Sequence, residues 1–468
     1  MNAPILWIFL PLALGGLSLL FRNERTLVII GSASALTLSL LALFVPIDTA
    51  LLEGIFSFKL AGSMNILGRS FVLETAHGPL LAILYGLAAM WFFGAETLKL
   101  ARRMIPAGLV ILSLLVAAIA VRPFLFASVF IEIAVLVSVP MFLSLKQTPG
   151  RGITRYLIYQ TLAIPFILFA GWLLSSVETS PGDVALTAQS TAMLAMGFAF
   201  LLAIFPLYTW IPLLIEEAPP YLVGFLLWLL PQTTALFAMG FLDRYPFLRL
   251  STDLMGLLRA AGLLMVVSAG LWAAFQHHLG RLMGYAAIAE TGFLLIAIGL
   301  GTESGIQLVF LQIIPRGLGL AVWAMSLSVI QSHADPPRFS NIQGMARILP
   351  FATAGVILAN LSASGFPLLA GFPIRMALLE SLARQSIVQT IWLSMGLLGL
   401  MAGAVRTLAV AVLSGTATSW QSRETRTQVT LIALGLLALF ALGLFPQISQ
   451  FLLKSLPALF QNLGQGVL

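Results

Sequence analysis

The stretch FPLYTWIP occupies residues 205–212, in the middle of a long apolar run. A second stretch, FPLLAGFP, occupies residues 366–373 in another apolar run and repeats the frame F-P-L-x-x-x-x-P. A proline inside a helix removes a backbone hydrogen bond and kinks or breaks the helix. We therefore expect two discontinuous helices at membrane depth. The prolines expected to break them are Pro206, Pro212, Pro367 and Pro373.

The composition around these stretches is that of a membrane protein. Of 468 residues, 60% are hydrophobic and 9% are charged, and the mean hydropathy is +1.03. Ordinary soluble domains carry about 25% charged residues. Apolar runs recur from end to end at the length of about 20 residues that a spanning helix needs, which predicts about fourteen transmembrane helices. No barrel-type alternation is present, so we expect an all-α, polytopic protein, with the polar segment 53–77 as a surface loop.

Several kinds of chemistry are excluded by composition. The chain has no cysteine, which excludes disulfides, thiolate metal sites and iron–sulfur ligation. Its four histidines form no HExxH motif, and neither a Walker motif nor a GxGxxG motif occurs. We therefore expect no cofactor and no metal. The net charge of +7 comes mostly from arginines and lysines in the loops at one membrane face, and so we expect no nucleic-acid partner.

The distribution of these cations predicts the orientation of the chain. Arginine and lysine concentrate in the loops after most odd-numbered spans. Cytoplasmic loops carry the excess of such residues, so we expect both termini on the outer side of the membrane. Arg244 and Arg249 are exceptions, because they follow the eighth span.

The two proline frames fall in the seventh and twelfth expected spans, five spans apart, and therefore run in opposite directions. This arrangement predicts an inverted repeat of five helices, in which the discontinuous helices mark an ion path. The alternative is that the frame recurs by chance. The expected divisions are transmembrane helices 1–3 in residues 1–103, a first repeat in 104–242, a second, inverted repeat in 251–413, and a C-terminal helix and tail in 427–468.

Two carboxylates at membrane depth are candidates for function, because burying a charge there is costly. Glu132 lies mid-span in FASVFIEIAVLVSVP, and Glu290 lies about halfway along the span YAAIAETGFLLIAIG. Hydrocarbon favours the protonated form of a carboxyl group and a nearby cation favours the charged form, and either state suits a proton relay. The alternatives are a structural ion pair or a hydrogen bond between helices for Glu132, and for Glu290 a side chain that only caps a polar pocket.

Four further side chains complete the proposed proton path. Arg316 and Arg375 can bias a neighbouring carboxylate, but arginine stays protonated and cannot itself pass a proton. Their alternative role is that of a snorkelling or ion-paired side chain. Gln232, near mid-span, can orient water without carrying charge. Tyr208, inside the first proline frame, is a further candidate partner in proton transfer.

The segment GFAFLLAIFPLYTWIPLLIEEAPPYLVGFLLWLLPQTTAL, which starts at Gly197, resembles the central motif of the antiporter-like subunits of respiratory complex I and of Mrp-type cation/proton antiporters. HLGRLMGYAAIAETGF from His278 and LSASGFPLLAGFPIR from Leu361 are similar to two further motifs of that family, and the span with Glu132 looks like its glutamate-bearing helix. The resemblance covers roughly residues 120–380.

The resemblance implies a subunit of a complex I-like, proton-translocating oxidoreductase in the inner (plasma) membrane of a prokaryote. Such a subunit has no active site of its own. It moves protons through hydrated half-channels coupled to electron transfer in partner subunits, and it assembles with other membrane subunits in the lipid bilayer. The alternatives are a degenerate, non-conducting structural subunit and an Mrp-like cation/proton antiporter subunit, and sodium is the alternative ion.

Departures from the family pattern put the first half-path in doubt. Leu201 and Gln232 stand where the family has lysines, and Tyr208 stands where it has a histidine. Glu290 replaces a histidine, and Arg375 replaces the lysine after the second break. A leucine cannot relay protons, so the second half-path, with Glu290 and Arg375, is the better candidate for transport.

Overall fold

The computed structural model describes residues 2–48, 60–66, 68–143, 148–179, 183–413, 422–460 and 462–463. The first part contains η1 (Ile5–Phe9), α1 (Leu10–Ser18), α2 (Glu24–Phe44), η2 (Thr75–His77), α3 (Gly78–Gly94), α4 (Ala101–Ala120), η3 (Phe124–Phe126) and α5 (Ala127–Phe142). The middle part contains α6 (Arg151–Thr179), α7 (Val184–Leu201), η4 (Leu207–Thr209), α8 (Trp210–Glu217), α9 (Pro220–Arg244), α10 (Pro246–Arg249), α11 (Thr252–Phe275), α12 (Leu279–Gly299), α13 (Glu303–Leu311) and α14 (Ile313–Gln331). The last part contains α15 (Met345–Ile348), α16 (Pro350–Ala363), α17 (Phe372–Ala383), α18 (Ile387–Val412), α19 (Arg426–Leu444), α20 (Gln447–Leu453) and η5 (Leu456–Leu459).

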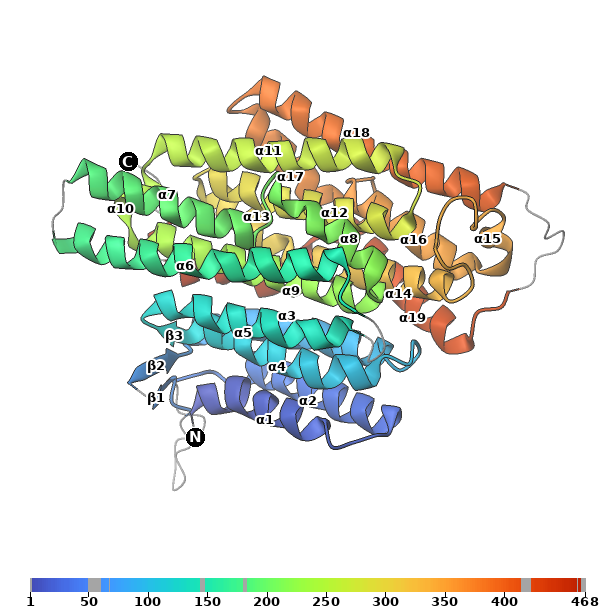
Figure 1. Ribbon diagram of the computed structural model, residues 1–468, viewed down its shortest axis with the longest axis horizontal. Helices are drawn as coiled ribbons and strands as arrows, with labels where there is room; N and C mark the ends of the chain where they lie inside the picture. The colour runs from blue at the N-terminus through green and yellow to red at the C-terminus, as the bar shows by residue number, and fades with distance from the viewer. Residues whose placement is uncertain are drawn as a thin grey trace.

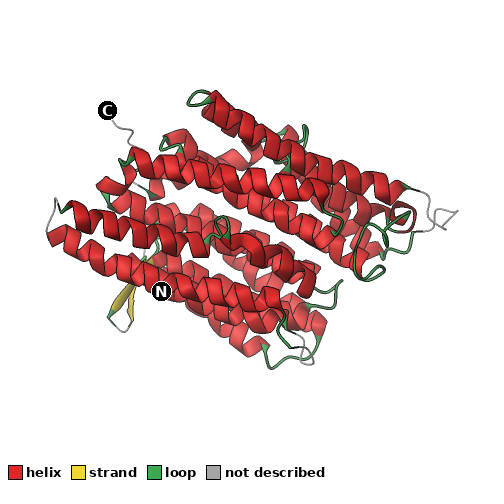
Figure 2. Ribbon diagram, turned by 45° about the horizontal axis from the view of Figure 1, so that its top comes forward, coloured by secondary structure: helices red, strands yellow, loops and turns green. Residues whose placement is uncertain are grey.

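The long helices run side by side in one bundle (Figures 1 and 2). Among the described residues, 12 helices are long and apolar enough to cross a membrane, and two shorter apolar helices, Ile5–Ser18 and Pro350–Ala363, accompany them. The prediction of a helical, multi-span membrane protein is confirmed. The total of about fourteen spans, the inverted repeat and the four divisions of the chain stay predictions.

A small antiparallel sheet departs from the all-α prediction. It consists of β1 (Ser63–Ile66), β2 (Arg69–Val72) and β3 (Val121–Arg122), in that order. Part of segment 53–77 was therefore wrongly expected to be a loop, while residues 53–59 and 67 lie outside the described residues. Phe71 is buried on the apolar face of β2, which is why so short a polar segment forms strands.

The two ends of the bundle are distinct in Figure 1. The sheet and α10 lie at one end, which we call the α10 face, and α15 lies at the other, which we call the α15 face. Figure 2 shows the strands projecting beyond the helices at one end. Because α12 begins at the α15 face and α11 begins at the α10 face, the ends of each helix can be assigned to a face.

Both proline frames interrupt a helix, as predicted. After α7 ends at Leu201 the chain passes through η4 before α8 begins at Trp210, and after α16 ends at Ala363 it turns before α17 begins at Phe372. The first proline of each frame lies in the interruption. The second lies in the first turn of the next helix, where a missing N–H group leaves no backbone carbonyl unpaired. This explains the shared spacing of the two frames.

Two helices form the centre of the bundle. The spans of α9 and α12 are almost entirely buried, and Figure 1 shows them between the group α1–α5 on one side and α11 with α18 on the other. α9 packs against α4 and α14, while α12 packs against α8 and α11. Helices at the perimeter expose large apolar side chains, among them Trp172 and Leu271, as surfaces that face lipid do. The polar groups of α9 and α12 are therefore held away from lipid.

Candidate functional site

Glu290, in the middle of α12, is a buried carboxylate with two partners. It is 6% exposed. Its Oε1 accepts from Arg375 in an ion pair, and its Oε2 accepts from Gln312 Nε2 at 2.5 Å. The same amide also donates to the backbone oxygen of Glu290 at 2.8 Å. A buried carboxylate is tolerated only when it is paired and hydrogen-bonded in this way.

Arg375 lies in the first turn of α17, directly after the second helix interruption. Its Nε donates to the backbone oxygen of Ala363, the last residue of α16, at 3.3 Å. Its guanidinium carbon lies 3.8 Å from the centre of the Phe293 ring. The final carbonyls of a helix have no partner within the helix and carry partial negative charge, so a cation is favourable there. Arg375 thus spans the gap in the broken helix and reaches Glu290.

Arg316, on α14, is a second buried cation beside this pair and is 2% exposed. Its Nη2 donates to the backbone oxygen of Leu227 at 2.9 Å and to Thr291 Oγ1 at 3.0 Å. The Leu227 oxygen is free to accept because Pro231, four residues further along α9, has no N–H group to offer it. A proline inside α9 therefore creates the acceptor that holds Arg316.

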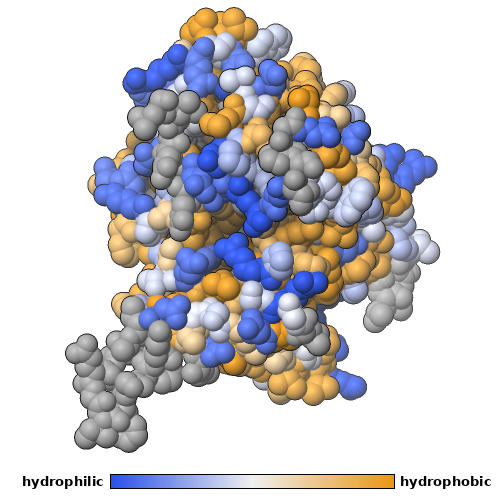
Figure 3. Space-filling model, turned by 90° about the vertical axis from the view of Figure 1, so that its left-hand side faces the viewer, coloured by the Kyte–Doolittle hydropathy of each residue, from blue (hydrophilic) through white to orange (hydrophobic). Residues whose placement is uncertain are grey.

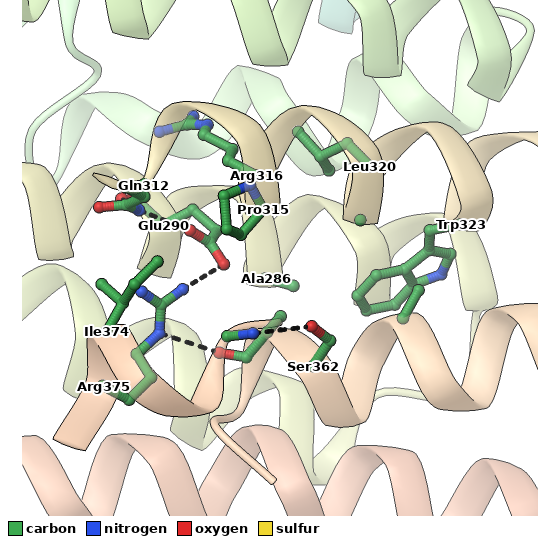
Figure 4. A pocket seen from close by; sticks show the side chains of 14 residues that line it. Ala286, Glu290, Gln312, Pro315, Arg316, Leu320, Trp323, Ser362, Ile374 and Arg375 are labelled. Carbon is green, nitrogen blue, oxygen red and sulfur yellow. Dashed lines mark hydrogen bonds and ion pairs between the residues drawn. The ribbon is translucent and has the colours of Figure 1, made fainter. Parts of the chain in front are cut away.

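These side chains surround a cavity of about 20 Å³, lined also by Trp323 and Ser362. A cavity of this size holds about one water molecule. Figure 4 shows Arg375 reaching Glu290 from one side, with Gln312 and Arg316 on the other. Within the cluster Glu290 is the side chain that can carry or lack a proton, because the arginines stay charged and the amide stays neutral. The arrangement can therefore bind or release a proton at Glu290 beside two fixed positive charges.

Gln232 lies next to this cluster but not in it. It is 1% exposed, and its Nε2 is 3.4 Å from the backbone oxygen of Val309, in the last turn of α13. Its Oε1 has no hydrogen-bond partner. Gln312, the partner of Glu290, follows Val309 by one turn. The structure thus brings Glu290, Arg316 and Arg375 together and places Gln232 at their edge.

Glu132 and Tyr208 lie apart from the cluster. Glu132 is half-buried on α5, its Oε1 accepts from Thr161 Oγ1 at 2.8 Å, and its Oε2 has no partner. Over the described ranges, no ion pair links Glu132 to an arginine or lysine. Tyr208 is buried in η4, with its ring centre 5.8 Å from that of Phe205. Neither side chain lines the cavity beside Glu290.

The first helix interruption is filled by a neutral side chain that the sequence reasoning missed. Gln160, on α6, is fully buried, and its Nε2 donates to the backbone oxygens of Phe200 and Leu201 at 3.3 and 3.2 Å. These are the last carbonyls of α7, so Gln160 occupies the role that Arg375 has at the second interruption. The first break therefore holds an amide where the second holds a cation.

Gln312 and Gln160 could have been found in the sequence by one signal. Each is an amide in a largely apolar run, in LVFLQIIPRG and RYLIYQTL respectively. A polar side chain at that depth needs a buried partner. Which partner it takes depends on the packing of helices that are distant in the sequence.

His278 lies at the start of α12, at the end of the bundle that carries the α15 face. It is the N-cap of α12, where its Nδ1 accepts from the N–H groups of Gly280 and Arg281 at 3.1 and 3.4 Å. Burial lowers the pKa of His278 below its usual value, against the opposing effect of Glu216. Glu216, at the end of α8, in turn forms an ion pair with Arg281 at 2.6 Å.

Curated proteins match this chain in sequence over about half of its length. The chain is 28% identical over 258 residues to NAD(P)H-quinone oxidoreductase chain 4 1 of Synechococcus sp. strain JA-2-3B'a(2-13), a match that covers 51% of this chain and 47% of the relative. The chain thus spans about half the length of the curated relatives it matches.

Solved structures share the fold over almost the whole chain. A chain of respiratory complex I from Thermus thermophilus with bound NADH superposes with a TM-score of 0.78 at 19% identity, covering 99% of this chain and 100% of that one. A chain of the Mrp complex from Dietzia sp. DQ12-45-1b superposes with a TM-score of 0.77 at 14% identity, covering 99% and 97%. At such identities the likeness concerns the fold.

The family itself follows from a match to its model. The model described as "NADH:quinone oxidoreductase/Mrp antiporter, TM" matches residues 156–401, which include both helix interruptions and the cluster around Glu290. Because this match covers more than half of the residues of the chain, the chain belongs to the NADH:quinone oxidoreductase/Mrp antiporter transmembrane family.

Proposed function

We propose that this protein is an antiporter-like membrane subunit that carries protons within a complex I-like assembly, with Glu290 as its proton-binding group. The observation that carries the proposal is the ion pair of Glu290 with Arg375 across a broken helix. An ionisable residue buried at this depth is a functional candidate because its burial is costly. The cavity beside it admits a water that could deliver or remove the proton.

A file of buried polar atoms supports a path from this cavity toward the α15 face. Trp323 lines the cavity, and its Nε1 has no partner. The side chains of Asn360, Ser326 and Thr353 are also buried with unpartnered polar atoms. They lie on α14 and α16, which pack together and both reach the α15 face. Buried polar groups without protein partners are places where water is bound, so these residues can line a hydrated half-channel.

The non-conducting alternative draws its support from the first half of the chain. The first interruption holds Gln160 and Leu201, and neither can bind a proton. We therefore assign transport to the second half and a supporting role to the first. An Mrp-like antiporter subunit and transport of sodium remain alternatives that the same assay addresses.

Partners and location are part of the proposal. The perimeter of the bundle exposes large apolar side chains on α5 and α6, near Glu132, where a neighbouring membrane subunit can pack. We place the assembly in the inner membrane of a prokaryote, with the α15 face in the cytoplasm because most loop arginines lie on it, and with both termini outside.

The test is proton flux through the assembled complex in sealed vesicles, measured with and without sodium. Glu290→Gln keeps the shape and the hydrogen bond to Gln312 but cannot release a proton, so we expect flux to be lost while the complex still assembles. Glu132→Gln is the matched variant in the first half, and we expect it to retain flux. Unchanged flux in Glu290→Gln would refute the proposal, and flux that requires sodium would favour the antiporter alternative.

A further inference from the structure

A second and larger cavity opens on the α10 face. Its volume is about 380 Å³, and it lies between α3, α4, α9 and the segment after η5. Figure 3 views the end of the molecule that carries the α10 face and shows hydrophilic side chains gathered across its middle around a hollow. The residues that line the cavity and enter the argument are His77, Arg122, Thr233, Gly240, Asp243 and Arg244.

One face of α9 forms the wall of this cavity from the membrane surface inward. Thr233, Leu236, Phe237, Gly240 and Arg244 line it at the spacing of successive helical turns. Thr233 lies 11 residues before Arg244 along α9, and so roughly 16 Å deeper at 1.5 Å per residue. That depth is about half of the hydrocarbon thickness of a bilayer. The cavity therefore reaches the middle of the membrane.

The mouth of the cavity is suited to water. Arg122 and Arg244 bring positive charge, and Asp243 brings negative charge. His77 accepts from the backbone N–H of Glu74 through Nδ1, so the neutral ring carries its hydrogen on Nε2 and can donate from there. Charged groups of both signs and a donor attract water more strongly than they attract an acyl chain. The cations on this face are also exceptions to the usual distribution of arginine between membrane faces.

Polar groups continue from the inner end of this cavity to Glu290. Thr233 is followed in the chain by the unpartnered hydroxyl of Thr234 and preceded by Gln232, whose Oε1 is also unpartnered. Gln232 bonds the backbone oxygen of Val309, and Gln312, one turn later, bonds Glu290. No charged side chain is needed along this line. Bound water and hydroxyl groups can relay a proton between a vestibule and a carboxylate, and the amides of Gln232 and Gln312 can hold and orient that water.

We propose that this cavity is a water-filled vestibule through which Glu290 exchanges protons with the α10 face, by way of Thr233, Gln232 and Gln312. The inference rests on the proposed function of Glu290. The vestibule would give Glu290 access to the α10 face, and the buried polar side chains of α14 and α16 would give it access to the α15 face. The route bypasses the first helix interruption and its uncharged Gln160.

The absence of cysteine from this chain permits a direct test. Thr233→Cys is made in the full chain within its complex, in sealed vesicles of each orientation. A membrane-impermeant, positively charged methanethiosulfonate is added outside, and the mass of the chain reports modification. Gly240→Cys marks the mouth of the cavity, where a new Cβ has room because it would lie 3.9 Å from the ring of Phe124. Ala235→Cys, fully buried on the same helix and not lining the cavity, is the matched control.

We expect Thr233→Cys to be modified from the same side as Gly240→Cys, and Ala235→Cys to stay unmodified. Modification of Thr233→Cys should then lower the proton flux below that of the same variant before treatment. An unreactive thiol at position 233, with a reactive one at position 240, would overturn the proposal, and so would modification from the opposite side. If Thr233→Cys fails to accumulate, Leu236→Cys, one turn nearer the mouth, serves the same comparison.

The flux measurement separates this inference from the function on which it rests. A modified Thr233→Cys variant whose flux persists shows that the vestibule is a dead end, and the access route is then wrong. A reactive thiol in a complex that carries no flux even before substitution leaves the water-filled cavity in place and overturns the proposed function instead.

Discussion

Arg375 and Glu290 form an ion pair that joins the two halves of a broken helix to the buried centre of the bundle. The guanidinium bonds the last carbonyl of α16, stacks on Phe293 and reaches the carboxylate of α12. Among the described residues that line the cavity beside Glu290, Arg375 and Arg316 are the cations, and the position of Arg375 is fixed by the interruption itself. We therefore expect the conformation of the interruption between α16 and α17 to be coupled to the charge of Glu290.

Replacing Arg375 by methionine should destabilise the protein unless Glu290 is neutralised as well. Removing one partner of a buried pair leaves an uncompensated charge and typically costs about 3–5 kcal/mol. The measurement is thermal unfolding of the solubilised complex for Arg375→Met, Glu290→Gln and the double variant. We expect the double variant to be more stable than Arg375→Met alone. Additive losses in the two single variants would mean that the pair is not coupled.

Gly365→Ala should disturb the same pair from the backbone. Gly365 has φ of +79°, a conformation that favours glycine, and a Cβ there would lie 2.8 Å from Arg375 Cγ. We expect a lower unfolding temperature and a loss of proton flux. Gly16→Ala in α1 is the control, because nothing lies within 4 Å of its new Cβ and alanine favours the helix. Equal effects from both substitutions would contradict this account.

Gln160→Leu should weaken the fold without stopping transport. The amide of Gln160 donates to the carbonyls of Phe200 and Leu201 at the end of α7. Leucine removes this donor from the Leu201 carbonyl, while the Phe200 carbonyl still accepts from the N–H group of Ala203 at 3.2 Å. An unpaired buried polar group costs about 1–3 kcal/mol. Unfolding temperature should therefore fall while flux per assembled complex is retained. Loss of flux at full stability would show that the first interruption conducts after all.

Part of the fold could be predicted from local pattern alone. The two F-P-L-x-x-x-x-P frames break their helices because proline lacks an N–H group, a property that acts within one turn. The apolar runs likewise predict spans, because length and hydropathy are local. The sheet of β1–β3 was missed, since its strands are short and β3 pairs with a segment far away in the sequence.

The site was predictable only in part, for a related reason. Glu290, Arg316 and Arg375 were found because a charge in an apolar run is conspicuous. Their mutual contacts depend on the packing of α12, α14 and α17, and the capture of Arg316 depends on a carbonyl that Pro231 leaves free on α9. Gln312 and Gln160 carry no charge, so they stand out less in an apolar run, and the partner that each takes depends on the packing of helices distant in the sequence.

The N-cap of α12 gives the fold a dependence on pH that can be isolated. His278 caps the helix through Nδ1, which accepts two N–H groups only while the ring is neutral. Its pKa is lowered by burial, with smaller effects from Glu216, Arg281, Arg338 and Asp335. The folded protein therefore binds a proton at His278 less readily than the unfolded chain does, and neutral His278 favours folding.

The stabilisation of the fold by neutral His278 is complete above the pKa of the unfolded state, about 6.5, and is lost as the pH falls below that value. The loss levels off once the pH drops below the lowered pKa of the folded state. His278→Asn should keep the cap, because asparagine is a preferred N-cap residue, while removing the titrating ring. Unfolding temperatures of both proteins are compared across this pH range, so that groups common to both cancel. We expect the wild-type protein to lose more stability on acidification than His278→Asn. Parallel curves would show that the cap survives protonation, and the neutral-ring geometry of Nδ1 would then be the wrong assignment.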